Sequence, residues 1–314
     1  MGSNDPADTL FALRCVTIGN FDGVHRGHQA LLQAARRMAG PQGQVVAVTF
    51  HPHPMRLLRP EAAPQNVQLP AERERALRDA GADEVRTLEV DRNLLGMTAE
   101  GFIEWLHGDI RFDGIVEGSD FRFGKGRGGD MAMLARQGER SGFRVEPVAP
   151  VEITLKDGGT APASSSLLRW LISLGRVEDA ATVLGRPLGF AGKVIRGDQR
   201  GREIGWPTAN VEHGDRLLPG DGVYAGTARL PDGTVRRAAI SVGTKPTFGY
   251  AERTVEAFLL DHQAPLDQYG WTLELRFDRW LREQARYDAL DELLDQMRRD
   301  VDRTRAEVIL ETAA

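Results

Sequence analysis

The first half of the chain alternates strand-length apolar runs with helical patterns, and this alternation restricts its fold more than any other feature. Continuous apolar runs at residues 15–18 and 44–50 are typical of parallel strands covered on both faces. Further strands are predicted at 84–90, 115–117 and 143–148, with helices between them. This order predicts a doubly wound parallel α/β sheet, and such sheets bind ligands beyond the carboxyl ends of their strands.

A glycine-rich loop joins the first predicted strand to the first predicted helix. Gly19, Gly23 and Gly27 allow backbone N–H groups to approach a ligand closely, and a helix N-terminus favours an anion. His25 and His28 lie three residues apart, so their imidazoles share one face if the helix begins at His25. Such a pair suits stabilisation of charge on a phosphoryl group. A glycine-rich turn with two exposed histidines is the alternative reading of the pair alone.

Two other segments are expected at the same edge of the sheet. Residues 51–54, His-Pro-His-Pro, follow the second strand, and their two prolines hold the backbone extended. The loop at 120–129 combines two aromatic rings that can stack on a planar ligand with three cations that can meet phosphate. These side chains are Phe121, Phe123, Arg122, Lys125 and Arg127. A solvated surface loop is the alternative for this segment.

Ser164, Ser165 and Ser166 open another predicted helix. They form either an ordinary N-cap or, with Arg169 one turn further on, a phosphate-binding site. The chain has no Walker A loop and no GxGxxG fingerprint, so any phosphate site in the first half must use another device, the loop at 19–28. Zinc is disfavoured because no cysteine pair accompanies the histidines.

The pattern changes to short strands after a predicted linker at 186–189. Strands are predicted at 190–195, 223–230, 234–242, 253–260 and 271–280, with a hairpin turn at Pro231-Asp232-Gly233. Five or six short strands predict a small antiparallel barrel. An amphipathic helix at 288–310 follows, and we expect it to pack on the barrel rather than to dimerise. The domains predicted are therefore 1–186 and 187–314.

One segment of the second half carries possible metal ligands. Thr208 and Asn210 lie two apart after Pro207, so they face the same way in extended chain, and their oxygens suit Mg²⁺. An Asx-type turn is the alternative for this segment. Glu256 lies in a predicted strand and is either a solvent-facing residue or a base that accepts a proton from an attacking alcohol. We expect it at the mouth of the barrel, opposite Thr208 and Asn210.

Composition narrows the class of protein further. The net charge of −5 argues against nucleic acid as the main partner. Cys15 is the only cysteine, so we expect a buried hydrophobe and a reducing compartment. No signal-peptide pattern and no apolar run near the roughly 20 residues that span a bilayer is present. We therefore expect a cytoplasmic protein with no membrane partner; its oligomeric state stays open.

The ordered set of these segments resembles the bacterial bifunctional riboflavin kinase/FMN adenylyltransferases, also called FAD synthetases. The segments that carry the resemblance span most of the chain and are residues 19–28, 49–54, 120–127, 164–166, 207–210, 222–225, 242–248, 252–256 and 281–284. The resemblance implies a nucleotidyltransferase-type α/β domain followed by a six-stranded antiparallel β-barrel with a C-terminal helix. The chain departs from the family's usual residues at His51, Ser166, Leu167 and Trp206.

The resemblance also implies two reactions and assigns residues to them. Riboflavin and ATP give FMN in the C-terminal domain, and FMN and ATP give FAD and pyrophosphate in the N-terminal domain. The expected catalytic residues are His25, His28 and Glu256, with Thr208 and Asn210 as Mg²⁺ ligands. The expected substrate and nucleotide contacts are Gly19, Asn20, Phe21, Asp22, Gly27, Phe50, Pro52, Pro54, Asp120, Phe121, Arg122, Arg127, Ser164, Ser165, Ser166, Arg169, Gly192, Lys193, Gly205, Pro207 and Arg276.

Two other functions remain as alternatives. The first is a nucleotidyltransferase of similar fold for another acceptor, such as a pantetheine phosphate, with the barrel as an accessory domain. The second is a flavin-binding regulator without catalysis. The segments at 207–210 and 252–256 argue against the first alternative, and the retained histidines, Thr208, Asn210 and Glu256 argue against the second.

Overall fold

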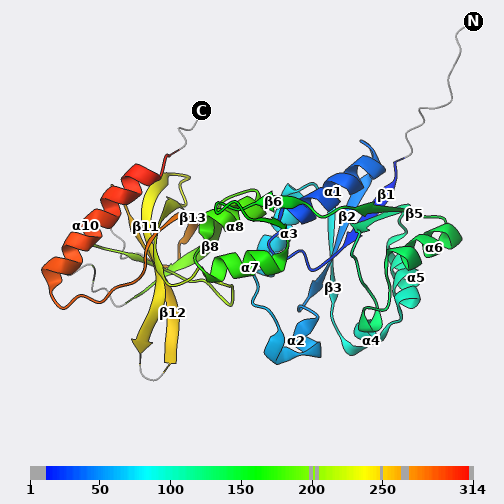
Figure 1. Cartoon of the computed structure of the whole chain (residues 1–314), viewed down its shortest axis with the longest axis horizontal. Helices are drawn as coiled ribbons and strands as arrows, with labels where there is room; N and C mark the ends of the chain where they lie inside the picture. Colours follow the sequence, from blue (N-terminus) through cyan, green and yellow to red (C-terminus); the bar gives the residue numbers. More distant parts are fainter. Residues whose placement is uncertain (1–11, 198–200, 202–204, 248–249, 263–268, 311–314) are drawn as a thin grey trace, which may run out of the picture. The chain divides into compact units, whose positions relative to one another are not determined.

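The computed structural model describes residues 12–197, 201, 205–247, 250–262 and 269–310 (Figure 1). The chain forms two compact units, and each is described by itself. The first comprises Met1–Gln65, Leu69–Ile153 and Ala161–Ser165, and the second comprises Asn66–Gln68, Thr154–Thr160 and Ser166–Ala314. The boundary of the functional domains between residues 186 and 187 stays a prediction.

The first unit is built on a five-stranded parallel sheet. Its strands are β1 (Arg14–Ile18), β2 (Gln44–His51), β3 (Glu84–Glu89), β4 (Gly114–Gly118) and β5 (Arg144–Val148), in the order β3-β2-β1-β4-β5. The predicted doubly wound parallel sheet is thus confirmed. The chain leaves β1 toward β2 and later returns to its other side with β4. The switch point of this topology therefore lies between β1 and β4, where such sheets bind their ligands.

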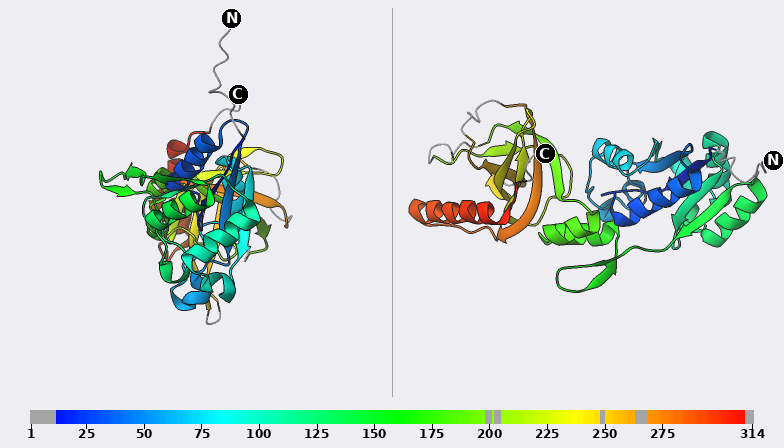
Figure 2. Two further views of the ribbon diagram at one scale, coloured as in Figure 1. Left: turned by 90° about the vertical axis from the view of Figure 1, so that its right-hand side faces the viewer. Right: turned by 90° about the horizontal axis from the view of Figure 1, so that it is seen from above.

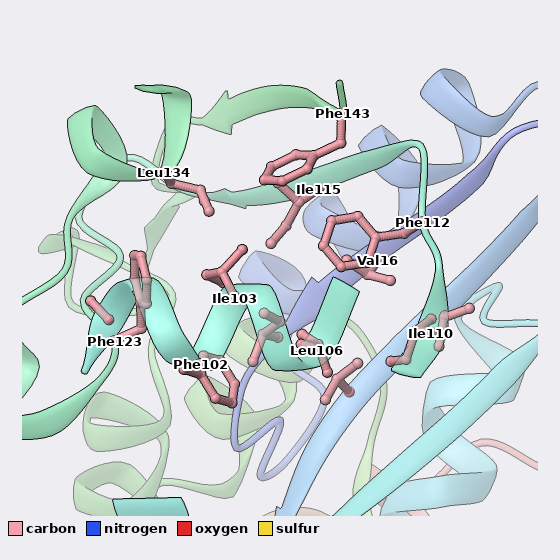
Figure 3. Packing of buried hydrophobic residues seen from close by; sticks show 14 residues of the cluster. Val16, Phe102, Ile103, Leu106, Ile110, Phe112, Ile115, Phe123, Leu134 and Phe143 are labelled. Atoms are coloured by element: carbon pink, nitrogen blue, oxygen red, sulfur yellow. The ribbon is translucent and has the colours of Figure 1, made fainter. Parts of the chain in front are cut away.

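Helices cover both faces of this sheet because successive side chains of its central strands are apolar and point to opposite faces. On one face, α1 (Arg26–Ala39) and α3 (Pro70–Asp79) pack over a cluster that contains Cys15 and Val116. On the other face, α5 (Ala99–Ile110) and α6 (Met131–Ser141) pack over Val16 and Ile115. Figure 3 shows this second cluster, with Ile103 of α5 directed toward Ile115. The N-cap residue of α5 is Thr98, whose hydroxyl accepts a hydrogen bond from the Gly101 N–H.

Several short elements were not predicted from the sequence. They are α2 (Met55–Leu58), the 3₁₀ turns η2 (Pro60–Ala62) and η3 (Lys125–Arg127), α4 (Arg92–Gly96), and the β6 (Glu152–Thr154) and β7 (Thr160–Pro162) hairpin. The tip of this hairpin belongs to the second unit. There Asp179, which is nearly fully buried, accepts hydrogen bonds from the Lys156 N–H and the Arg176 guanidinium.

The second unit contains a closed antiparallel barrel, as predicted. Its strands are β8 (Leu188–Ile195), β9 (Ala209–Val211), β10 (Gly222–Arg229), β11 (Val235–Thr247), β12 (Tyr250–Leu259) and β13 (Thr272–Arg282). The order around the barrel is β10-β11-β12-β9-β8-β13. The predicted linker at 186–189 is wrong in its second half, because Gly189 already pairs with Arg276. A Cβ atom at Gly189 would lie 2.2 Å from the Leu275 carbonyl oxygen, so this close strand contact requires glycine.

Among the described residues, the barrel is accompanied by the helices α7 (Ser165–Ser173), α8 (Val177–Leu184) and α10 (Leu290–Glu307). As expected, α10 packs against the barrel, on β10, β11 and β13, and Figure 2 shows it in red along the barrel wall. The Arg282 guanidinium holds it there through hydrogen bonds of 2.7 and 3.0 Å to the buried Asp300 carboxylate. Within the described part of the chain, none of the helices combines the length and apolarity needed to cross a membrane.

Candidate active sites

The loop after β1 is held tightly in place. Its first residue, Gly19, donates a hydrogen bond of 3.0 Å to the Val48 carbonyl of β2. Phe21 and Val24 have φ values of 48° and 43°, and both side chains are buried. The Val24 N–H also donates to the Phe21 carbonyl at 3.1 Å. Left-handed backbone at a non-glycine residue costs of order 1–3 kcal/mol and is concentrated at functional sites, which makes this loop a candidate.

The two histidines of this loop lie together, as their spacing predicts. Helix α1 begins at Arg26, with His25 as its N-cap residue. The imidazole rings of His25 and His28 are stacked, with centroids 3.6 Å apart and an interplanar angle of 23°. The Phe21 ring contacts His28 edge-on at 5.0 Å. The structure therefore joins two imidazoles to the amide-rich end of a helix, which is an anion-binding arrangement.

The serine segment also lies against this loop. The Ser165 hydroxyl donates a hydrogen bond of 2.8 Å to the Asp22 carbonyl. A Cβ atom at Gly27 would lie 3.0 Å from the Ala163 carbonyl oxygen, so only glycine allows this approach without a shift. Ser164 is part of the same compact unit, whereas Ser166 and Arg169 belong to the second unit.

Arg73 of α3, which was not predicted as a site residue, supports the loop. Its guanidinium is nearly fully buried and donates hydrogen bonds of 3.1 Å to the carbonyls of Asn20 and Phe50. Burial lowers the pKa of Arg73, and the nearby Asp22 carboxylate opposes that shift. Arg73 precedes the buried Leu77 by one helical turn, so its position on the inner face of α3 was a usable signal.

The segments that follow β2 and β4 reach the same edge of the sheet. The side chain of Phe50 packs on the core, Pro52 and Pro54 are half-buried, and His51 is exposed. In the other loop Asp120, Arg122 and Arg127 are exposed. The two rings of this loop differ: Phe123 is buried in the core, and the half-buried Phe121 stacks on it at 5.2 Å. The expectation that both rings are available to a ligand is therefore wrong for Phe123.

A buried acid that was not predicted from the sequence lies beside the loop. Glu117 lies near the carboxyl end of β4 and is 1% exposed. Its Oε1 accepts the Ile18 N–H at 2.5 Å. Burial raises the pKa of Glu117 well above its ordinary value, and the hydrogen bond from Ile18 opposes this shift. A carboxyl within the apolar run at 115–117 was visible in the sequence as an exception to its pattern.

The barrel carries a second group of polar residues on its outer wall. Val255 and Ala257 point into the barrel and are buried, so Glu256 between them points outward. The expectation that Glu256 projects to the mouth of the barrel is therefore wrong. In the strand register, Glu256 lies directly between Asn210 of β9 and Ser241 of β11. Side chains directly opposite each other on neighbouring strands share one face of the sheet.

Thr208 completes this group. Its hydroxyl donates a hydrogen bond of 3.1 Å to Oε2 of Glu256. The hydroxyl lone pairs and the amide oxygen of Asn210 are hard ligands of the kind that Mg²⁺ accepts, so the residues present fit this ion. The neighbouring Trp206 ring packs on Phe258, with centroids 4.8 Å apart.

The other residues predicted for the second site are spread along the barrel. Gly192 and Lys193 lie on β8 beside the end of β9, since the Glu212 N–H donates to the Lys193 carbonyl. Gly205 and Pro207 are exposed next to Thr208. Arg276 is not brought to the Glu256 group: it pairs with Gly189 at the far end of β8, whereas Asn210 pairs with Ile195.

Comparison with known proteins identifies relatives over nearly the whole chain. The FAD synthetase family model matches residues 11–159, and the riboflavin kinase model matches residues 184–308. The bifunctional riboflavin kinase/FMN adenylyltransferase of Escherichia coli K12 is 35% identical over 295 residues, which cover 91% of this chain and 90% of the relative. That of Bacillus subtilis 168 is 31% identical and covers 91% and 89%.

One solved structure is similar along its whole length. It is titled a macrolide-efflux protein from Streptococcus pneumoniae, is 30% identical, and covers 94% of each chain with a TM-score of 0.82. Its title names an efflux function for that protein. Both family models that match the present chain describe flavin enzymes instead.

Proposed function

The chain belongs to the bacterial bifunctional riboflavin kinase/FMN adenylyltransferase family, and we propose that the two residue groups described above carry its two activities. The enzyme uses ATP to phosphorylate riboflavin to FMN and to adenylylate FMN to FAD. These assignments from family membership exclude the other acceptor and the non-catalytic regulator considered from the sequence. The assignment of individual residues is our proposal.

The Gly19–His28 loop binds the ATP phosphates during adenylyl transfer. The phosphate of FMN attacks the α-phosphorus of ATP, and pyrophosphate leaves. The stacked pair of His25 and His28 donates hydrogen bonds to the oxygens on which charge develops, where such donors act most strongly. The N-terminal amides of α1 bind the same anion. The serines at 164–166 and Arg169 form a second phosphate contact, and Asp120 and Phe121 contact the flavin.

Glu256 acts as the base in riboflavin phosphorylation. The Thr208 hydroxyl donates its proton to Oε2 of Glu256, so the lone pairs of Thr208 remain for a cation. Oε1 of Glu256 accepts the proton of the ribityl 5′-hydroxyl as that oxygen attacks the γ-phosphorus of ATP. Thr208 and Asn210 would hold Mg²⁺, which supplies charge neutralisation to the phosphates when bound. The single observation that supports this assignment most directly is the 3.1 Å contact between Thr208 and Glu256.

Two substitutions in the full-length enzyme test both sites against each other. We expect His28→Ala to lower FAD formation by about 10²–10³-fold, the effect of one missing transition-state donor, with FMN formation unchanged. We expect Glu256→Gln to lower FMN formation by about 10²–10⁴-fold, since the amide cannot accept the proton, with FAD formation from supplied FMN unchanged. FMN and FAD are separated by chromatography and quantified by absorbance.

The control variants carry similar substitutions at exposed positions outside the two proposed sites. Gln33→Ala lies on the outer side of α1, and Glu292→Gln lies in the first turn of α10. Both should behave as wild type. If His28→Ala makes FAD at the wild-type rate, the loop is not the adenylylation site. If Glu256→Gln phosphorylates riboflavin normally, Glu256 is an ordinary strand residue.

Three broader assignments accompany this proposal. The adenylyltransferase is assigned to residues 1–186 and the kinase to residues 187–314, in agreement with the separate family matches. A cytoplasmic location is proposed because the buried, single Cys15 suits a reducing compartment. The partners proposed are the small-molecule substrates riboflavin, FMN and ATP.

A further inference from the structure

Strands β1 and β4 separate just below the candidate adenylylation loop. Their ladder ends at the pair of Val16 and Ile115. Two residues further along each strand, the Ile18 N–H donates to the side chain of Glu117 rather than to the backbone of β4. The carboxyl group therefore bridges the two strands at the switch point of the sheet. It holds the last residue of β1 directly before Gly19, where the loop begins.

This carboxyl lies in apolar surroundings. Glu117 is 1% exposed, and Ile115, two residues earlier on the same face, belongs to the cluster under α5 and α6. Within the described residues, the salt bridges found do not include Glu117. Burial raises the pKa of Glu117, and the hydrogen bond from the Ile18 N–H opposes the shift. A carboxyl that is buried without a cation is stable only in its neutral form.

The charged side chains on neighbouring elements do not supply a counter-charge. They are Arg14 on β1, Arg26, His28, Arg36 and Arg37 on α1, Arg144 and Glu146 on β5, Glu100, Glu104, His107 and Asp109 on α5, and Arg136, Glu139 and Arg140 on α6. Arg14 pairs with Glu84, and His107 contacts the Phe112 carbonyl at the other end of the sheet. Among these described residues, none acts on the pKa of Glu117, which responds to burial and to its hydrogen bonds.

We propose that Glu117 is a positioning residue for adenylyl transfer, which ties β4 to the start of the Gly19–His28 loop as a neutral acid and releases the loop when it ionises. An ionised Glu117 cannot stay buried without a cation, so the side chain must reach water or admit it between β1 and β4. Either movement disturbs the Ile18 contact. The inference rests on the proposed function of the loop. The ATP and FMN that the loop would bind are anions, so they disfavour a negative charge on the nearby Glu117.

The experiment compares three substitutions in the full-length enzyme. Glu117→Gln imitates the neutral acid, because its amide oxygen still accepts the Ile18 N–H and cannot gain charge. Glu117→Leu removes the acceptor, and Glu139→Gln, exposed on α6, is the matched control. FAD formation from FMN is measured from mildly acidic to alkaline pH. FMN formation from riboflavin by the same polypeptide is the internal reference.

We expect the FAD rate of wild type and Glu139→Gln to fall at alkaline pH relative to the FMN rate. Glu117→Gln should match wild type near neutral pH and lack this alkaline decline. In Glu117→Leu the FAD rate should be lower by roughly tenfold or more at every pH, because the buried Ile18 N–H no longer has a hydrogen-bond acceptor. A role in stability alone would change the melting temperature with pH but leave the pH profile of the FAD rate, measured well below that temperature, the same as in Glu117→Gln.

Coincident pH profiles of wild type and Glu117→Gln overturn the proposal, whether or not Glu117→Leu folds. The His28→Ala enzyme separates this failure from failure of the site assignment. If His28→Ala cannot make FAD and the two profiles coincide, only the role of Glu117 is wrong. If His28→Ala makes FAD normally, the chemistry occurs elsewhere and both assignments fall.

Discussion

Replacing Arg73 by methionine tests how much the adenylylation loop depends on a support outside it. Methionine fills most of the space of the arginine stem and removes both hydrogen bonds to the Asn20 and Phe50 carbonyls. Hydrogen bonds from a charged donor contribute about 1.5–3 kcal/mol each. We take the lower value, because the folded state also pays for dehydration of the guanidinium and Thr49 still donates to the Asn20 carbonyl. Two bonds then amount to about 3 kcal/mol.

A loss of this size is measurable by calorimetry. In a protein unit of 150–250 residues, 1 kcal/mol shifts the melting temperature by about 2–4 °C, so Arg73→Met should lower that of the first unit by about 6–12 °C. FAD formation should fall as well, because Asn20 belongs to the candidate site. FMN formation should stay at the wild-type rate, since the kinase group lies in the other unit.

The control for this prediction lies on the same helix. Arg75 is exposed on α3, so Arg75→Met removes a guanidinium of equal size and charge without touching the loop. We expect its melting temperature and both activities to match those of wild type. If Arg73→Met and Arg75→Met melt at the same temperature, the buried hydrogen bonds of Arg73 do not stabilise the unit and the reasoning is refuted.

Two further predictions concern stability. Asp300→Ala leaves Arg282 without its carboxylate partner and should destabilise the barrel unit by roughly 3 kcal/mol. Asp295→Ala, which breaks an exposed ion pair, should change the stability little. Equal urea midpoints of the two variants would contradict this prediction. Because the folded-state pKa of Glu117 is raised, the stability it provides is complete below its unfolded pKa and is lost as pH rises toward the folded value. The melting temperature of the first unit should therefore decline with pH in wild type more steeply than in Glu117→Gln, and parallel declines would exclude this effect.

Periodicity predicted the elements well because the buried runs are long and continuous. The runs at 15–18 and 44–50 became β1 and β2, and the helix predicted at 288–310 became the shorter α10. The missed strand β9 has three residues, too few for its alternation to be distinguished from a turn. The error at 186–189 has a different cause: glycine is typical of linkers, yet Gly189 is required by a close contact inside the barrel.

The candidate sites were less predictable, since burial is decided by the tertiary structure. Phe121 and Phe123 look alike in the sequence, and only packing assigns Phe123 to the core. Arg73 and Arg75 are chemically identical, and only the rotation of α3 buries one of them. Alternation separates Glu256 from its neighbours Val255 and Ala257, but it does not state which side of the strand is the interior. That depends on how the barrel closes.

The placement of Glu256 on the outer wall has a consequence for how ligands enter and leave. Val255, Ala257, Ile240 and Phe277 fill the interior, so a flavin cannot be threaded through the barrel. A closed barrel has no free edge along which it could open. Ligands must therefore enter and leave at the outer surface of the barrel, while the pairing of its strands stays unchanged. During turnover the amide protons of the barrel strands should exchange with solvent as slowly as they do in the resting enzyme.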